Sequence, residues 1–337
     1  MKILKIAGKT GKSIIAIGEK ISHLDKYCEA EKKVIITDKT TRKFHKGLFP
    51  DCEVIEIGEG ELNKTLETVN KIYEKFLEFG LDRSSFVIGI GGGIVCDVTG
   101  FAASTYLRGL RFGFVPTTLL AQIDASVGGK NGVNFKGYKN LIGTIRQPEF
   151  VLCDFEMLKT LPKSELSNGF AELIKHAIIA DAKLFDYLEA NVSRALSLEK
   201  EVIEKIIYRS LQIKAKVVSK DEIEKGERRI LNFGHTFGHA IEKTTGLRHG
   251  EAISIGMVAA ATLSVAKKML SEPDEKRLEQ ILTAFGLPTK MIGDKEALID
   301  AIRKDKKKEH EKINFVLLEK IGKAKITEID LLCFYSL

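Results

Sequence analysis

The sequence predicts an α/β domain with a parallel sheet over residues 1–160, followed by an all-α domain over residues 161–337. Strand-like and helix-like segments alternate in the first half, as in parallel sheets that carry helices on both faces. After Pro162 the pattern becomes helical. A chain of 337 residues is also long enough to build two hydrophobic cores.

Short apolar runs mark the expected strands of the first domain. Phe86–Ile90 is apolar apart from one glycine, which is typical of a buried parallel strand. Leu62–Phe79 has helical periodicity and stops at Gly80, a residue suited to end a helix. The six expected strands are Ser13–Ile17, Lys33–Thr37, Glu53–Ile57, Phe86–Ile90, Phe112–Pro116 and Phe150–Cys153.

The second half has the apolar spacing of amphipathic helices. The expected helices are Phe170–Ala180, Ala182–Ala190, Leu198–Lys220, Gly238–Lys243, Ala252–Leu270, Glu275–Phe285 and Lys295–Lys304. A site formed by both domains would lie in the cleft between them, a usual ligand location.

Composition indicates a soluble cytoplasmic protein that binds neither membrane nor nucleic acid. No apolar run approaches the ~20 residues of a membrane helix, and the N-terminal stretch is too broken for a secretory signal. Five cysteines, at 28, 52, 96, 153 and 333, lack CxxC spacing and are expected to be reduced thiols. The net charge of +7 favours an anionic substrate, while no basic stretch is interleaved with aromatics.

Asn232–Glu251 holds three of the seven histidines and predicts a metal site. Imidazole is the commonest biological metal ligand, and histidines with a carboxylate suit Zn²⁺. His235 and His239 share a helix face at i, i+4, so spacing alone selects this pair, with Glu242 one turn further. The alternative is a histidine pair that only packs or forms hydrogen bonds.

Gly91, Gly92 and Gly93 follow an expected strand and precede a helical pattern. Such a turn brings backbone N–H groups and a helix N-terminus close to a phosphate. The spacing is not GxGxxG, so the usual dinucleotide fingerprint is missing, and a turn without ligand is the alternative. Asp97 would contact a ligand hydroxyl or cap the helix.

Glycine-rich turns across residues 105–146 carry Arg108, Lys130, Lys139 and Asn140. Cations on short glycine loops suit phosphate or carboxylate recognition. Any one of these cations, taken alone, could simply be an exposed surface cation, and the run Asp305–Lys308 could be a solvated loop. The concentration of such residues within 105–146 nevertheless predicts a binding surface.

The chain resembles the 3-dehydroquinate synthases of the sugar-phosphate cyclase superfamily over most of its length. Seven motifs in order carry this resemblance: GGGIVCD, VPTTLLAQIDASVGGKNGVN, KNLIG, GFAELIKH, IKAKVVSKDE, ERRILNFGHTFGHAIE and HGEAISIGM. The resemblance implies a dinucleotide-binding α/β domain followed by a helical metal-binding domain, in agreement with the independent prediction. It also implies a homodimer, with Arg108 reaching across the interface.

The resemblance implies Zn²⁺, or Co²⁺ on the same ligands, held by Glu172, His235 and His249. This assignment differs from the one based on helix spacing, because His239 is given to the substrate. The implied NAD contacts are Asp38, Glu61, Lys64, Gly92, Gly93, Asp97, Thr117, Thr118, Lys139 and Thr160. Thr40 stands where the family often has asparagine, which leaves one ribose contact open.

The implied substrate is 3-deoxy-D-arabino-heptulosonate 7-phosphate, an anionic sugar phosphate that also bears a carboxylate. The implied contacts are Arg108, Asp124, Lys130, Asn140, Lys175, Lys214, Arg228, Asn232, His239 and either Lys306 or Lys307. Lys130, Asn140, Lys175 and His239 would surround the departing phosphate and be catalytic. Lys214 and Arg228 would hold the carboxylate.

The implied enzyme is a carbon–oxygen lyase of the shikimate pathway, which leads to chorismate and aromatic amino acids. NAD⁺ transiently oxidises the carbon-five alcohol, phosphate is eliminated, and the hydride returns. Ring opening and an intramolecular aldol closure then give 3-dehydroquinate, so NAD is recycled.

Three alternatives remain open: a cyclase for an uncarboxylated sugar phosphate, an NAD- and metal-dependent polyol dehydrogenase of the same fold, and an inactive homologue. The paired Lys214 and Arg228 argue against the first, the phosphate-handling lysines against the second, and the intact metal triad against the third.

Overall fold

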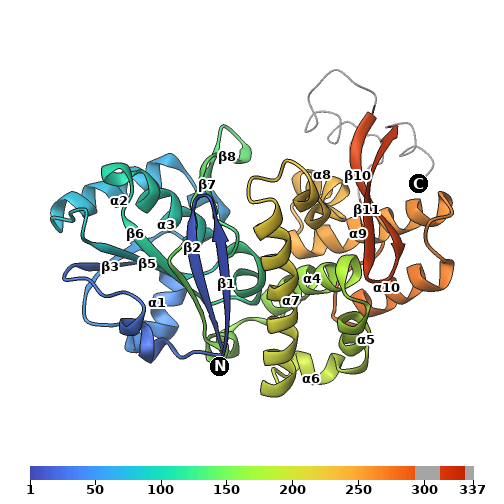
Figure 1. Cartoon of the computed structure of the whole chain (residues 1–337), viewed down its shortest axis with the longest axis horizontal. Helices are drawn as coiled ribbons and strands as arrows, with labels where there is room; N and C mark the ends of the chain where they lie inside the picture. Colours follow the sequence, from blue (N-terminus) through green and yellow to red (C-terminus); the bar gives the residue numbers. More distant parts are fainter. Residues whose placement is uncertain (293–311, 331–337) are drawn as a thin grey trace. The chain divides into compact units, whose positions relative to one another are not determined.

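The computed structural model describes residues 1–292 and 312–330 and divides into two compact units. Unit 1 comprises Met1–Pro162 and Lys214–Ile223. Unit 2 comprises Lys163–Ile213 and the residues from Glu224 onward. Figure 1 shows the helices and strands of each unit.

Unit 1 is built on a seven-stranded sheet in the order β1-β2-β9-β6-β5-β3-β4. Neighbouring strands are parallel except β1 and β2, which are antiparallel. The strands are β1 (Lys2–Gly8), β2 (Gly11–Ile17), β3 (Lys33–Asp38), β4 (Glu53–Ile57), β5 (Phe86–Gly91), β6 (Arg111–Pro116) and β9 (Phe150–Cys153). All six predicted strands are confirmed, with shifts of at most two residues at their ends.

Besides the short helix α1 (Lys39–His45), two strand features of unit 1 were not predicted. β1 carries exposed lysines and buries little besides Ile6, so its apolar signal is weak, and it pairs only at the sheet edge. The stretch expected to be turns contains a hairpin of β7 (Lys130–Phe135) and β8 (Tyr138–Ile145). Its two-residue turn, Lys136–Gly137, has positive φ at both positions, as a type I′ turn requires.

Helices and a buried aromatic core complete unit 1. The helices are α1 (Lys39–His45), α2 (Leu66–Glu78) and α3 (Gly93–Thr105). α2 begins later than predicted because the Thr65 hydroxyl accepts a hydrogen bond from the Thr68 N–H and caps it. In the core of unit 1, the Phe86 ring of β5 stacks on the Phe150 ring of β9, with 5.8 Å between the ring centroids. The Tyr27 ring lies 5.6 Å from the Phe150 ring.

Glu222 explains why Lys214–Ile223, from the end of α7 (Lys200–Lys220), belongs to unit 1. Its carboxylate accepts hydrogen bonds from the Lys9 N–H at 2.7 Å, from the Thr10 N–H and hydroxyl, and from Gln147 at 3.0 Å. These bonds fasten the segment to the β1–β2 turn and to the chain that leads into β9. The segment also carries Lys214.

Unit 2 is mainly helical, so the predicted fold class is confirmed with one correction. Its helices are α4 (Lys163–Ala180), α5 (Ala182–Ala190), α6 (Val192–Leu196), α7, α8 (His235–Thr245), α9 (His249–Ala266) and α10 (Glu272–Ala284). It is not all-α, because β10 (Lys312–Lys320) and β11 (Lys323–Asp330) pair as an antiparallel hairpin. The apolar residues of β10 form a run rather than a helical stripe, which favours a strand. The predicted helix Lys295–Lys304 lies outside the described residues.

α9 is the one helix of the described chain that is long and apolar enough to cross a membrane. In the window that passes this test, 67% of the residues are buried inside the protein. Such burial is typical of a core helix, and the flanking α4, α8 and α10 contact it.

Candidate functional site

The glycine turn of unit 1 lies at the carboxyl end of β5, where α3 begins. None of the three glycines has a positive φ. Close packing requires them instead: a Cβ on Gly92 would lie 3.3 Å from Thr118 Cγ2, and one on Gly93 3.0 Å from Ala125 Cβ. The glycines thus let two side chains of the following loop pack against the N-terminus of a 13-residue helix, an end that favours negative charge.

The other residues predicted to contact NAD follow different strands of the same parallel sheet. Asp38 ends β3, Glu61 and Lys64 follow β4, Thr117 and Thr118 follow β6, and Thr160 follows β9. The carboxyl ends of parallel strands share one edge of a sheet, which is where α/β proteins bind ligands. The Thr117 N–H donates to Gly91 O at 2.9 Å and joins two of these loops directly.

Asp38 and the nearby Thr40 each have a local structural partner. Asp38 caps α1 by accepting a hydrogen bond from the Thr41 N–H at 2.8 Å. Thr40, at the position that differs from the family, donates its hydroxyl to Glu59 at 2.6 Å. The hydroxyl at residue 40 is thus held by a neighbouring carboxylate.

Lys64 links the glycine helix to the β7–β8 hairpin. Its ammonium group is buried, pairs with Asp97 of α3 and donates to Asn140 Oδ1 at 2.6 Å. Burial raises the pKa of Asp97, and the charge of Lys64 opposes that shift. Asp97 does not cap α3, where Gly92 occupies the N-cap, and the ion pair with Lys64 is its contact in the described chain.

Unit 1 also positions four residues that were predicted to contact substrate. Lys214 is 5% exposed and forms an ion pair with Asp124. Lys130 begins β7 with an exposed side chain, and Arg108 is exposed with φ +66°. An isolated lysine usually lies on the surface, but Lys214 is buried.

In unit 2, Glu172, His235 and His249 come together from α4, α8 and α9. Glu172 Oε1 lies 3.6 Å from His235 Nε2 and 3.5 Å from His249 Nε2. Zinc bonds of about 2.0–2.1 Å at tetrahedral angles separate ligand atoms by roughly 3.4 Å. Glu172 is fully buried, and its carboxylate lies among cationic or metal-ligating groups: Lys175 pairs with Oε2, and the two imidazoles lie beside Oε1. A divalent cation fits this set.

The remaining ring nitrogens orient the two imidazoles. His235 Nδ1 lies 3.2 Å from Phe233 O, and His249 Nδ1 lies 3.4 Å from a Glu242 carboxylate oxygen. With an N–H on each Nδ1, each Nε2 would be free to bind a metal ion held beside Glu172, which is the tautomer of a metal ligand.

Burial and charge set the protonation of this cluster. Burial disfavours an ionised Glu172, yet Lys175 and the histidines lower its pKa well below the usual value. Burial also lowers the pKa of His235 strongly. It opposes protonation of His249 too, but hydrogen bonding to Glu172 and Glu242 raises the pKa of that ring to about 9.

The other predicted residues of unit 2 flank this cluster or lie in η7 (Glu227–Asn232). The His239 ring lies 5.2 Å from that of His235 and 6.2 Å from that of His249, between centroids. Arg228 is 3% exposed, and Asn232 donates to Glu224 at 2.6 Å. Lys306 and Lys307 lie outside the described residues.

Small residues bring the two histidine helices together. A Cβ on Gly256 of α9 would lie 2.1 Å from Gly234 O and 2.7 Å from Gly238 N, at the start of α8. The Gly250 N–H donates to Asn168 Oδ1 of α4. His235 and His249 thus converge because glycine lets the backbones approach and Asn168 holds the first turn of α9.

Sequence reasoning missed Asn134 and Asn168 as parts of these sites, and it named Glu242 only as a carboxylate one turn beyond His239, not as the partner of His249. Asn168 stands four residues before Glu172, on the same face of α4, and Glu242 stands seven before His249. Asn134 lies inside a quoted motif six residues before Asn140. Their spacing from a candidate site residue could have pointed to them. Each, however, contacts a residue on another helix or strand, which the sequence alone does not bring close.

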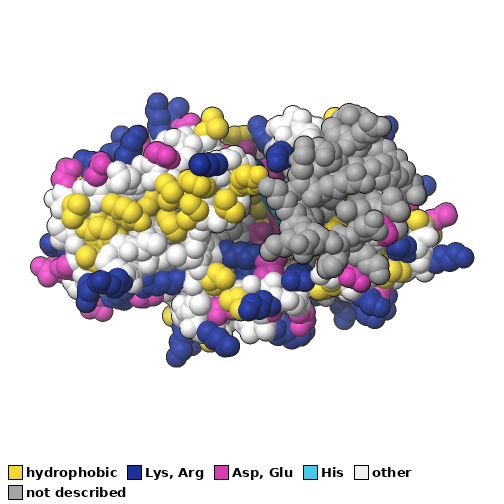
Figure 2. Space-filling view, turned by 90° about the horizontal axis from the view of Figure 1, so that it is seen from above, with side chains coloured by type: hydrophobic (Ala, Val, Ile, Leu, Met, Phe, Trp, Pro, Cys, Tyr) yellow, Lys and Arg dark blue, Asp and Glu magenta, His cyan; other side chains and the backbone are white. Residues whose placement is uncertain are grey.

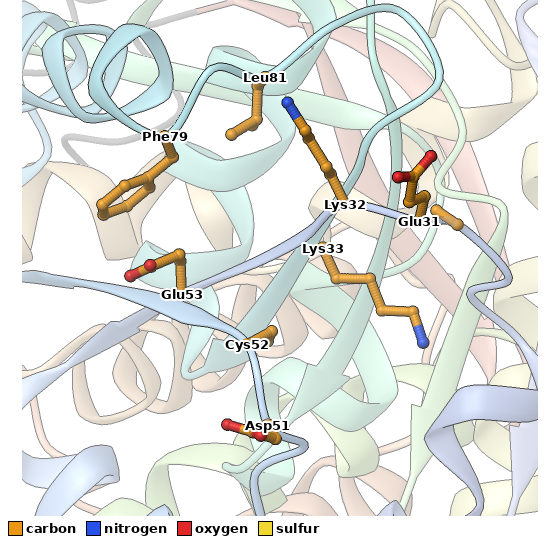
Figure 3. A pocket seen from close by; sticks show the side chains of 9 residues that line it. Glu31, Lys32, Lys33, Asp51, Cys52, Glu53, Phe79 and Leu81 are labelled. Atoms are coloured by element: carbon orange, nitrogen blue, oxygen red, sulfur yellow. The ribbon is translucent and has the colours of Figure 1, made fainter.

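A cavity of about 600 Å³ in unit 1 is separate from these residues. Figure 3 shows its lining, which includes Lys32, Lys33, Glu53 and Phe79. Lys33 begins β3 and Glu53 begins β4, so the cavity lies at the amino edge of the sheet, opposite the glycine turn. Lys32 donates to Gly80 O at 2.7 Å and Lys33 pairs with Asp25 at 2.6 Å. Its cations already have protein partners.

Comparisons with known proteins agree with this arrangement. The family model of the 3-dehydroquinate synthase N-terminal region matches residues 54–168, and that of the C-terminal region matches residues 169–308. The 3-dehydroquinate synthase of Thermoanaerobacter pseudethanolicus is 45% identical over 317 residues, covering 90% of this chain and 89% of the relative.

Two solved structures resemble the whole chain. 2-Deoxy-scyllo-inosose synthase, complexed with carbaglucose-6-phosphate, NAD⁺ and Co²⁺, is 27% identical with a TM-score of 0.89, covering 99% of this chain and 98% of its own. 2-Epi-5-epi-valiolone synthase from Streptomyces hygroscopicus subsp. jinggangensis 5008, with NAD⁺ and Zn²⁺ bound, is 26% identical with a TM-score of 0.89, covering 100% and 98%. The protein is an enzyme, a carbon–oxygen lyase acting on phosphates, and it belongs to the 3-dehydroquinate synthase family.

Proposed function

We propose that this chain converts 3-deoxy-D-arabino-heptulosonate 7-phosphate into 3-dehydroquinate and phosphate, using NAD and a divalent metal ion. The observation that carries the proposal is the convergence of Glu172, His235 and His249, in a chain 45% identical to a 3-dehydroquinate synthase. The domain boundary near residue 160 and the separate residue roles are parts of the same proposal.

Glu172, His235 and His249 would hold Zn²⁺ or Co²⁺. Three protein ligands leave positions for substrate hydroxyls, as catalytic metal sites do. The ion would lower the pKa of the substrate alcohol and polarise the ketone derived from it. Glu242 positions the His249 ring through Nδ1, and the buried Lys175 fixes the Glu172 carboxylate.

NAD is assigned to the carboxyl edge of the sheet in unit 1, where backbone and polar groups from five strands meet. Both solved relatives were crystallised with NAD⁺. The glycine turn would receive the pyrophosphate, with Thr117 and Thr118 beside it and the Lys64–Asp97 pair at the first turns of α3. NAD would carry the hydride, while the protein orients it.

The residues assigned to the substrate form two groups, one for its phosphate and one for its carboxylate. Lys130, Asn140, Lys175 and His239 would surround the phosphate and stabilise its negative charge as the carbon–oxygen bond breaks. Arg228 would bind the carboxylate with its planar fork, and Lys214 would add a point charge. Holding both ends of the opened product favours ring closure in one geometry.

Product analysis tests the proposal. We expect the purified enzyme with the heptulosonate phosphate and substoichiometric NAD⁺ to release one phosphate per substrate with no net NADH, because the hydride is returned. Stoichiometric NADH would instead identify a polyol dehydrogenase. Turnover of glucose 6-phosphate in preference to the heptulosonate phosphate would identify a cyclase for uncarboxylated sugars.

Arg228→Ala tests the carboxylate assignment. Truncating a desolvated charge pair costs about 2–5 kcal/mol, so we expect kcat/KM for the heptulosonate phosphate to fall roughly thirtyfold to several-thousandfold. Metal content and NAD⁺ affinity should stay close to wild type. Arg228→Lys should recover only part of the loss, since lysine lacks the bidentate fork.

Arg229→Ala is the matched control, because that neighbouring arginine is only half-buried and has no assigned role. It should retain kcat/KM within about twofold, the range of ordinary surface changes. Unchanged kcat/KM in Arg228→Ala, with the melting temperature preserved, would remove the main reason for preferring a carboxylated substrate.

The proposal includes a cytoplasmic homodimer formed through unit 1. Unit 1 exposes Leu107, Phe135, Tyr138 and Leu141, and Figure 2 shows hydrophobic side chains gathered in a band on one face of this unit. Such a band favours association with another surface. Sedimentation equilibrium should give twice the 37.4 kDa chain mass, and a monomer at all concentrations would contradict this part.

A further inference from the structure

Asn134 has no assigned role in the proposed reaction, yet it occupies an irregularity of the β7–β8 hairpin. Val133 pairs with Ile142 and Phe135 pairs with Tyr138, so the register shifts between the two pairs. Asn134 therefore stands alone opposite residues 139–141 of β8. A bulge of this kind redirects side chains and is common beside active sites. The bulged strand carries Lys139 and Asn140.

Hydrogen bonds join Asn134 to two segments of the proposed site. Its N–H leaves the hairpin ladder and donates to Lys64 O at 2.8 Å. Its amide Nδ2 donates to Glu61 Oε1 at 2.8 Å, and its Oδ1 accepts from the Asn140 N–H at 2.9 Å. These partners fix which way the amide points, because one side must donate and the other accept.

The contacts close into a ring. Lys64 Nζ donates back to Asn140 Oδ1 at 2.6 Å, while Asn134 receives the Asn140 N–H and gives its own to Lys64 O. Asn140 has φ +52°, a conformation that costs free energy for a residue with a side chain and that persists when its surroundings hold it. Oδ1 of Asn134 supplies that hold from outside the turn.

We propose that Asn134 is a positioning residue that couples the NAD-binding turn Glu61–Lys64 to the phosphate-contacting Asn140. The inference rests on the proposed function for the roles of Lys64 and Asn140. Asn134 itself is assigned no contact with either ligand. It sets the Asn140 backbone and the Glu61 carboxylate in one arrangement, so that its loss changes cofactor binding and substrate binding together.

Asn134→Ala tests the coupling with two readouts besides turnover. We expect the Kd for NAD⁺, measured calorimetrically on the substrate-free protein, to rise about tenfold, because hydrogen bonds to both a charged and a strained partner are lost. We expect KM for the heptulosonate phosphate to rise by a similar factor. Metal content should not change, since the ligands lie in unit 2.

Two further variants separate coupling from general loss of structure. Asn134→Asp keeps the acceptor for the Asn140 N–H but faces Glu61 with a second carboxylate. Its penalty on NAD⁺ binding should therefore shrink in a Glu61→Gln background, where the new amide can donate to Asp. In an Asn140→Ala background, Asn134→Ala should add little to KM, because the group that it positions is already missing.

Asn70→Ala is the matched control, since Asn70 is an exposed asparagine of α2 whose amide donates to Glu74 Oε1 at 2.9 Å. It should leave both constants at wild-type values. Wild-type NAD⁺ affinity and KM in Asn134→Ala, or full additivity with Asn140→Ala, would overturn the inference. Failure of the wild-type enzyme to bind NAD⁺ or release phosphate would instead overturn the proposed function.

Discussion

His249→Ala is expected to lose most bound metal and about a thousandfold or more of the activity. His249 Nε2 lies 3.5 Å from Glu172 Oε1, and alanine leaves only two of the three protein ligands. A bound metal contributes several kcal/mol to stabilising transition-state charge, and about 4 kcal/mol corresponds to a thousandfold rate change. Metal stoichiometry by plasma emission spectroscopy, beside the phosphate-release assay, measures both effects.

Two other histidines provide controls for this result. His239→Ala should keep a full equivalent of metal while losing activity, because that ring is assigned to substrate. His23→Ala should change neither, since its side chain is 45% exposed and pairs with Glu19 in unit 1. A full equivalent of metal in His249→Ala would show the ligand assignment to be wrong and would make His239 the leading candidate.

Gly256→Ala is expected to destabilise unit 2 by about 3 kcal/mol or more and to weaken metal binding in the remaining folded protein. The new Cβ would meet Gly234 O at 2.1 Å and Gly238 N at 2.7 Å, and both atoms are backbone. Overpacking of a tight core costs about 1–3 kcal/mol, and a backbone contact has no rotamer with which to relieve it. α8 must therefore move away from α9 and carry His235 with it.

Thermal unfolding with and without zinc measures this effect. Gly47→Ala is the matched control, because a Cβ there meets nothing within 4 Å and the backbone has no positive φ. That change should be neutral within about 0.5 kcal/mol. A Gly256→Ala protein with wild-type melting temperature and zinc affinity would show that close approach of α8 and α9 does not position the histidines.

Local pattern was sufficient for most of the elements because it reflects burial along one segment. The continuous apolar run of β5 and the amphipathic periodicity of α5 each report which side chains face a core. Where burial is weak or one-sided, the pattern failed: β1 exposes most of its residues, and the glycines and polar residues of β7–β8 hid a hairpin. The β10–β11 hairpin was missed although β10 carries a buried apolar run, Phe315–Leu318, that favours a strand.

The candidate site residues also differ in whether the sequence alone can identify them. Histidine and glycine clusters are visible in the sequence, because their chemistry depends on residue type and short spacing. Helix spacing alone selected His235 with His239, and only the family motifs put His249 and Glu172 beside His235. In the structure α4, α8 and α9 meet, so the potential metal-binding atoms of these three residues lie within 4.8 Å of one another.

The sequence by itself determined the two-part architecture, the glycine turn after β5 and the family, since each depends on local pattern or on motifs in fixed order. Only the tertiary structure decided the orientation of the imidazoles by Glu242 and Phe233, and the ring formed by Lys64, Asn134 and Asn140. The physical reason is that these are directional contacts between distant segments. A hydrogen bond depends on where its partner lies after folding, and no local periodicity encodes that position.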